Sequence, residues 1–466
     1  MKISLEKLVW KLLGLSILAT LVNGLSGPIP INELGLELWT YVAAVFMAAV
    51  WWMVLRRGKA HAPITKNFFR IQAFFLILLV VSLALNFGDI LSGYTNGTSA
   101  VLKFLAASIV YGYSLLFALS ISVLIDREGI EGGLDKLARV FVVLAWVAIV
   151  VGAFEIATWF APELRRAFIS FRGIYSIRPA GEFLRLNGLS YEPSFFSAVQ
   201  LCAFPWVVYD LQRRRLARNY LLIVLLLGLS YVSGSRTHLI GSGVLLTSIF
   251  IMGAGRWGRR TQQVATTGLV LSFFVLGPAL PAIILNQLSV GSSVSDITRA
   301  TLAGEAIEAG FNNPLGLGFG QSNAAAVAGL DGGGFPSWEL DSYFNGENGD
   351  DLPPVYSWFA RAIAEFGIIG YGAIAISACF GIVRCVGKAA RQKATRPLVL
   401  LLILNVAAFF AIGVSTETYR FFALWGAMIV AACIKTISRS EISAPIVAGK
   451  KRRRIVLRRP SLGQSS

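Results

Sequence analysis

The sequence predicts an all-α polytopic membrane protein with about twelve transmembrane helices and a large outer loop subdomain. Of the 466 residues, 55% are hydrophobic and 14% are charged, and the mean hydropathy is +0.66. Apolar runs recur along the whole chain, and basic residues concentrate in short connections between them. This composition excludes an ordinary soluble domain. The net charge of +17 is therefore interpreted as a signal of topology, and we expect no nucleic-acid partner.

The lengths of the apolar runs define the expected spans, because a helix needs about 20 largely apolar residues to cross a bilayer. On this basis we expect twelve spans, of which the seventh is short and the tenth long, near residues 8–26, 38–55, 71–88, 104–125, 140–161, 194–211, 220–233, 239–255, 265–287, 357–383, 398–415 and 421–435. The first run has no small-residue cleavage site and is expected to be retained as a span. The chain is thus predicted to be one transmembrane domain, 1–435, followed by a basic tail, 436–466.

Basic residues predict the orientation of the spans. Arginines and lysines gather in the connections 56–70, 213–218, 256–260 and 384–396, which all fall on one side when twelve spans are counted. The positive-inside rule predicts that this side, and with it both termini, is cytoplasmic. The tail should contact anionic membrane lipids. A chain-length regulator is a candidate partner for the tail, although no sequence feature indicates one.

Two long connections, 162–193 and 288–356, are expected on the opposite side. The second is acidic, whereas the first carries the arginines Arg165, Arg166, Arg172, Arg178 and Arg185 against the charge rule. So many arginines on this side indicate an anionic partner. A salt-bridged loop and an accident of topology are the alternatives.

Glu192 and Arg236 are the strongest single candidates for a site. Pro193 follows Glu192 and favours a helix start there, where a carboxylate faces the positive end of the helix dipole. A simple helix cap explains this pattern equally well. Arg236 lies between two short apolar runs, so it should be close to membrane depth and face a polar cavity, unless it reaches the headgroups from a tight turn. In a cavity shared with Glu192, its planar guanidinium would suit a diphosphate.

Other polar features have simpler interpretations. The segment 313–320 has alternating glycines but follows a helical pattern, so a loop against the membrane is favoured over a nucleotide site. Arg361 and Glu365 are four residues apart on one helical face, where they could neutralise each other or join an anion site. The four cysteines and two histidines lack metal-ligand spacing, so we expect neither a disulfide nor a metal.

The order of these motifs resembles the O-antigen polymerase and O-antigen ligase superfamily of bacterial cell-envelope glycosyltransferases. The similarity covers roughly residues 180–420, and its motifs are Gly188–Ser197, Ser235–Thr237, Arg299 with Asn313–Gly320, and Ala364–Gly370. It implies an integral-membrane glycosyltransferase fold in the bacterial inner membrane. It also implies a periplasmic reaction without a cofactor, on an oligosaccharide carried by undecaprenyl diphosphate.

One departure from the family pattern bears on the activity. Ligases of this superfamily often carry a histidine in the late outer loop, but the loop 288–356 has none. Polymerisation of lipid-linked repeat units is therefore favoured over ligation of the glycan to lipid A core or to protein. A transporter or a lipid-oligosaccharide flippase is the alternative from another class, although the sequence has no related halves.

The implied chemistry assigns roles to the candidate residues. A departing lipid diphosphate gains negative charge, which preplaced arginines stabilise. The acceptor hydroxyl needs a base, and an ionised carboxylate can serve. The arginine candidates are Arg178, Arg185, Arg236, Arg299 and Arg361. The candidates for the base are Glu192 first, then Glu365 and Asp341.

Overall fold

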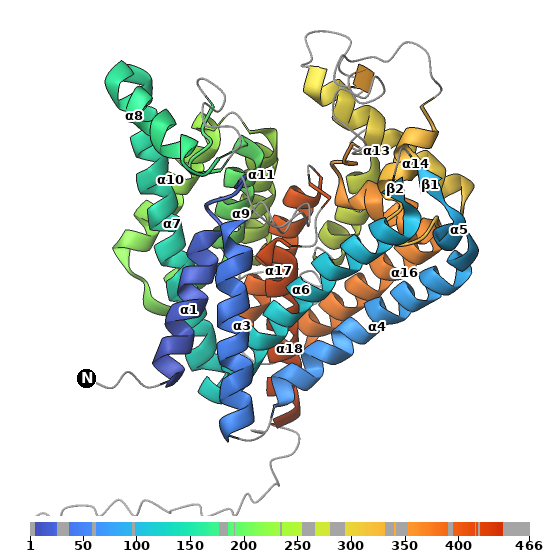
Figure 1. Ribbon diagram of the computed structural model, residues 1–466. Helices are drawn as coiled ribbons and strands as arrows, with labels where there is room; N and C mark the ends of the chain where they lie inside the picture. The colour runs from blue at the N-terminus through green and yellow to red at the C-terminus, as the bar shows by residue number, and fades with distance from the viewer. Residues whose placement is uncertain are drawn as a thin grey trace, which may run out of the picture.

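The chain folds into a bundle of helices (Figure 1). The computed structural model describes residues 5–25, 37–57, 62–95, 98–176, 185–190, 192–233, 235–253, 266–279, 294–330, 340–341, 353–389, 395–414, 416–417 and 420–440. These residues are almost all helical. The two named strands, β1 (Tyr94–Thr95) and β2 (Thr98–Ser99), form an antiparallel pair in which Tyr94 lies opposite Ser99. The prediction of an all-α fold is confirmed.

Each predicted span overlaps a helix. These helices are α1 (Leu5–Ala19), α3 (Leu38–Arg57), α4 (Pro63–Leu85), α6 (Ala100–Glu128), α7 (Ile130–Phe160), α9 (Pro193–Arg214), α10 (Ala217–Val232), α11 (Arg236–Gly253), the helix Thr266–Ala279, α16 (Trp358–Ala389), α17 (Arg396–Gly413) and α18 (Phe422–Ser440). The connections contain α5 (Phe87–Ser92), α8 (Pro162–Gly173), α13 (Val294–Asn312) and α14 (Ser322–Ala328). Among the described residues, seven helices are long and apolar enough to cross a membrane. The count of twelve spans stays a prediction.

The helices divide into a buried centre and an apolar periphery. In α9, 89% of the most apolar window is buried, against 17% in α4. The outer face of α4 presents large apolar side chains, including Ile77 and Val80. A helix that is apolar all round fits a membrane span, because lipid replaces water at its outer face. The chain is thus a helical multi-pass membrane protein.

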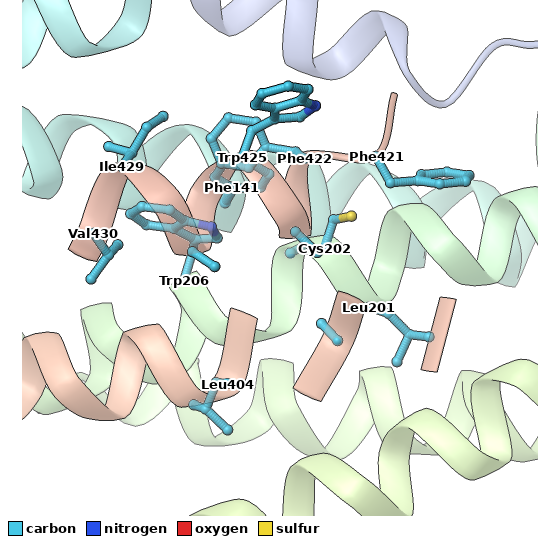
Figure 2. Close-up of a cluster of buried hydrophobic side chains, with 14 of the residues drawn as sticks. Phe141, Leu201, Cys202, Trp206, Leu404, Phe421, Phe422, Trp425, Ile429 and Val430 are labelled. Carbon is cyan, nitrogen blue, oxygen red and sulfur yellow. The ribbon is translucent and has the colours of Figure 1, made fainter. Parts of the chain in front are cut away.

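The centre of the bundle is packed by aromatic rings from three helices (Figure 2). Trp206 of α9 stacks on Phe141 of α7 with their ring centroids 5.3 Å apart, and Phe422 of α18 lies 4.9 Å from Phe141. Trp206 is fully buried. Close packing is the main attraction between helices in lipid, because the lipid tails are themselves apolar. These rings therefore fix α9 against its neighbours.

A side chain from the end of α6 caps the start of α4. The Asp126 carboxylate accepts hydrogen bonds from the backbone N–H groups of Ile64 and Thr65, at 2.9 and 2.8 Å, and from the Thr65 hydroxyl, at 2.7 Å. Asp126→Ala should therefore lower the free energy of unfolding by about 1–3 kcal/mol. The midpoint of thermal unfolding in detergent measures this loss. Asp89→Ala removes an exposed carboxylate from α5 and should have little effect; equal shifts in both variants would contradict the prediction.

Candidate functional site

Glu192 lies immediately before α9, as predicted. Its backbone is extended, with φ −131° and ψ 147°, so the helix begins at Pro193. Within the described chain its side chain makes no capping hydrogen bond to a backbone N–H. Instead, Glu192 Oε2 accepts a hydrogen bond of 3.1 Å from the Ser194 hydroxyl. The position of Glu192 before α9 is compatible with a helix cap, but its carboxylate contacts other side chains instead.

Arg299 of α13 is the cation beside Glu192. Its Nη2 lies 3.9 Å from Glu192 Oε2, and the two side chains are 33% and 24% exposed. The Arg299 guanidinium also lies over the Tyr356 ring, 4.9 Å from the centroid, which is a cation–π contact. Tyr356 has φ +58°, a left-handed conformation that costs a bulky residue about 1–3 kcal/mol. Tyr356 therefore holds its ring against Arg299 at some cost in backbone strain.

A buried network of ionic and hydrogen-bonding contacts is connected to the backbone next to Tyr356. Arg361 Nε lies 2.8 Å from Glu365 Oε1, so the two residues pair as their spacing allowed. Arg361 Nη1 donates to the Glu417 carbonyl oxygen at 3.1 Å, and the Glu417 carboxylate accepts a hydrogen bond from the Val355 N–H. Because Val355 directly precedes Tyr356, this network also fixes the chain that carries the Tyr356 ring. Removing one partner of such a pair would leave a buried charge uncompensated.

The glycine-rich segment docks into a break in α16. At Gly367 φ is +68° and ψ is 175°, so the helix is interrupted there. The freed Ala364 and Glu365 carbonyls accept hydrogen bonds from Leu317 N, at 2.9 Å, and Gly318 N, at 3.2 Å. A Cβ atom at Gly367 would lie 2.1 Å from the Pro314 carbonyl oxygen. Glycine is required here both by the left-handed backbone and by the close approach of the loop.

A second buried ion pair lies beside the start of α9. Arg420 Nη1 is 3.0 Å from Glu37 Oε1, and both side chains are buried. The Arg420 guanidinium also lies 5.0 Å from the centroid of Phe195, three residues after Glu192. Arg420, Glu37 and Glu417 were not predicted from the sequence. Their position as charged residues directly flanking apolar spans on the predicted outer side was the available signal.

The first outer loop uses two of its arginines structurally. Arg172 is buried and donates to the Ser190 carbonyl oxygen at 2.7 Å. Burial lowers the pKa of its guanidinium, and the negative charge of Glu155 opposes that shift. Glu155 in turn accepts from Gly188 N at 2.6 Å, so the two residues shape the loop before Glu192. Arg166 pairs with Glu163 on the surface of α8. For Arg166, the salt-bridged alternative describes the loop, whereas Arg172 is held by a backbone carbonyl.

Of the remaining predicted site residues, the structure describes Arg185 and Asp341 fully, Arg236 only in its backbone, and Arg178 not at all. Arg185 is exposed in the loop before α9, and Asp341 is exposed beside Leu340, which packs in an apolar cluster with α13. Arg236 is the first residue of α11, but its side chain lies outside the described part of the chain. Arg178 and the tail from 441 onward also lie outside the described residues.

The position of α11 bears on Arg236. A Cβ atom at Gly241 would meet Leu201 of α9, at 2.6 Å, and Ala411 of α17, at 3.1 Å, so α11 packs between these helices. Because α10 returns the chain from the end of α9, α11 begins at the end of the bundle where α9 begins (Figure 1). The backbone of Arg236 therefore lies at the same end as Glu192.

These features define a helical multi-pass membrane protein with a partly exposed arginine–carboxylate pair at one end. The chain matches no family model, no curated protein and no solved structure. Among the described residues, no group of three or more His, Cys, Asp or Glu is arranged to hold a metal ion. The described groups can bind an anion through Arg299 and accept a proton through Glu192.

Proposed function

We propose that the protein is a membrane glycosyltransferase that polymerises lipid-linked oligosaccharide repeat units at the periplasmic face of the bacterial inner membrane. The observation that carries the proposal is the partly exposed pair of Glu192 and Arg299 at the start of α9. Both residues belong to the motifs that resemble the polymerase and ligase superfamily. The orientation, with both termini cytoplasmic, rests on the basic connections.

In the proposed reaction Glu192 and Arg299 have different roles. Glu192 accepts the proton of the acceptor hydroxyl as that oxygen attacks the anomeric carbon of the donor sugar. The bond between that carbon and the diphosphate oxygen breaks, and undecaprenyl diphosphate leaves with its negative charge. Arg299, with Arg236 at the same end of the bundle, stabilises that charge. At 3.9 Å the Arg299–Glu192 separation exceeds a hydrogen bond, so Arg299 can turn to a phosphate without breaking one.

The activity is tested by the length distribution of surface glycan in a strain that lacks the chain. Loss of long glycans with single repeats still attached supports polymerisation. Loss of all attachment would instead show a ligase. Accumulation of lipid-linked units at the cytoplasmic face would show a flippase.

Arg236→Ala is expected to abolish long glycans while the protein inserts at its normal level, because an arginine that neutralises the leaving group acts mainly in the transition state. The measurement is the glycan ladder of the complemented strain, normalised to the amount of protein in the membrane. The control is Arg218→Ala, which removes an exposed arginine at the start of α10. The start of α10 lies at the other end of that helix from the connection that leads to Arg236. Wild-type glycan lengths with Arg236→Ala would exclude Arg236 from the site.

A further inference from the structure

Helix α8 packs against the end of α7 at the edge of the bundle (Figure 1). The Phe168 ring of α8 lies edge-on to the Phe154 ring of α7, with the ring centroids 5.8 Å apart. Phe154 precedes the last residue of α7 by about as far as Phe168 follows the first residue of α8, so α8 turns back on α7. Just after α8, Ser176 forms a β-bridge with Leu25, which follows α1.

Helix α8 has one apolar face and one charged face. Leu164, Phe168 and Phe171 follow the i, i+4, i+7 spacing that places side chains on one side of a helix. Phe168 is buried, but Leu164 and Phe171 are 42% and 52% exposed, and Ile174, directly after the helix, is 79% exposed. Arg166 lies on the opposite side of the helix, in an exposed ion pair. The apolar face of α8 is therefore only partly covered by protein.

The exposed part of this face continues the lipid-facing surface of α7. Val143, Val150 and Phe154 are exposed on one side of α7, which is long and apolar enough to cross a membrane. Phe154 is also the residue that contacts Phe168 of α8. The 31 residues of α7 rise ~46 Å, whereas the hydrocarbon core of a bilayer is ~30 Å thick. The end of α7, and α8 with it, can therefore reach the headgroup region.

The last residues of α8 hold the loop that precedes Glu192. Arg172 donates to the Ser190 carbonyl oxygen at 2.7 Å, and the Tyr175 hydroxyl donates to the Leu189 carbonyl oxygen at 3.2 Å. Whatever holds α8 in place therefore also helps to hold this loop.

From this geometry we infer that α8 is an interfacial helix whose partner is the phospholipid surface at the end of the bundle where α9 begins. Its apolar face lies at the boundary between headgroups and acyl chains, its charged face lies in water, and the lipid contact steadies the loop before Glu192. Lipid is favoured over a protein partner because the exposed face is continuous with the lipid-facing surface of α7. The inference is independent of the proposed glycosyl transfer.

The depth of α8 is measured by fluorescence quenching of the full-length chain in phospholipid nanodiscs. The four native cysteines are replaced by alanine, and Leu164→Cys or Ile174→Cys is labelled with a polarity-sensitive fluorophore. Brominated acyl chains should quench both labels from a depth of about 5–10 Å, and aqueous iodide should quench them little. Arg166→Cys, on the charged face of the same helix, should show the reverse pattern.

Two results of this measurement would overturn the inference. Iodide quenching at Leu164→Cys and Ile174→Cys equal to that at Arg166→Cys would place the apolar face in water. Shielding of both labels from iodide and from brominated lipid alike would show that protein, such as a second copy of the chain, covers the face.

Hydrogen exchange of the otherwise wild-type chain in nanodiscs tests the effect on the loop. The double variant Leu164→Ser, Ile174→Ser should speed amide exchange in residues 185–190 at least about tenfold, because two large apolar side chains lose their lipid contact. The control Arg166→Ser should leave that exchange unchanged. If the double variant also leaves it unchanged, the lipid contact does not hold the loop and the inference fails.

Discussion

Replacing Glu192 by glutamine is expected to reduce chain extension by about 10²–10⁴-fold while the protein reaches the membrane at its normal level. Glutamine has nearly the shape of glutamate but cannot accept the proton of the acceptor hydroxyl. The Ser194 hydroxyl can still donate to the amide oxygen, so the start of α9 should be preserved. Extension is measured as the number of repeats added per unit of membrane protein, with purified lipid-linked units as substrate.

The matched control is Glu163→Gln. Glu163 is an exposed glutamate in the first turn of α8 and pairs with the exposed Arg166. It should therefore extend chains at the wild-type rate. If Glu192→Gln and Glu163→Gln extend chains equally well, Glu192 is not the base, even if the polymerase assignment is right.

Gly367→Ala is expected to cause the second large loss, through structure rather than chemistry. The added methyl group would strain a left-handed backbone and meet the Pro314 carbonyl, which is part of the docked loop. The combined cost should exceed about 2 kcal/mol. Because the same docking positions Glu365 and Arg361, chain extension should fall together with the midpoint of thermal unfolding.

Gly372→Ala provides the comparison within the same helix. A Cβ atom at Gly372 meets nothing within 4 Å, and alanine favours helix over glycine by about 1 kcal/mol. That variant should unfold at or above the wild-type temperature. An equally stable Gly367→Ala protein would show that the loop tolerates displacement from α16.

The helices were predictable because their determinants are local. A run such as 140–161 is apolar for long enough to cross a bilayer, and it overlaps α7. Arg361 and Glu365 were predictable as a pair for the same reason, since a spacing of four places them on one helical face. Neither prediction depends on which helices pack against each other.

The site was only partly predictable because its contacts join distant parts of the chain. Glu192 was singled out by the proline that follows it, but the position of Arg299 beside it depends on how α13 packs against α16. Arg420 and Glu37 form their ion pair across almost the full length of the sequence. No local spacing distinguishes these partners from other charged residues at the ends of spans.

The sequence by itself determined that this is a helical membrane protein and roughly where its long apolar helices lie, because the length and composition of an apolar run are enough to predict a span. Only the tertiary structure decided which charges meet. The free energy of a buried or half-buried ion pair depends on the distance between its partners and on how far both are shielded from water, and helix packing sets both quantities.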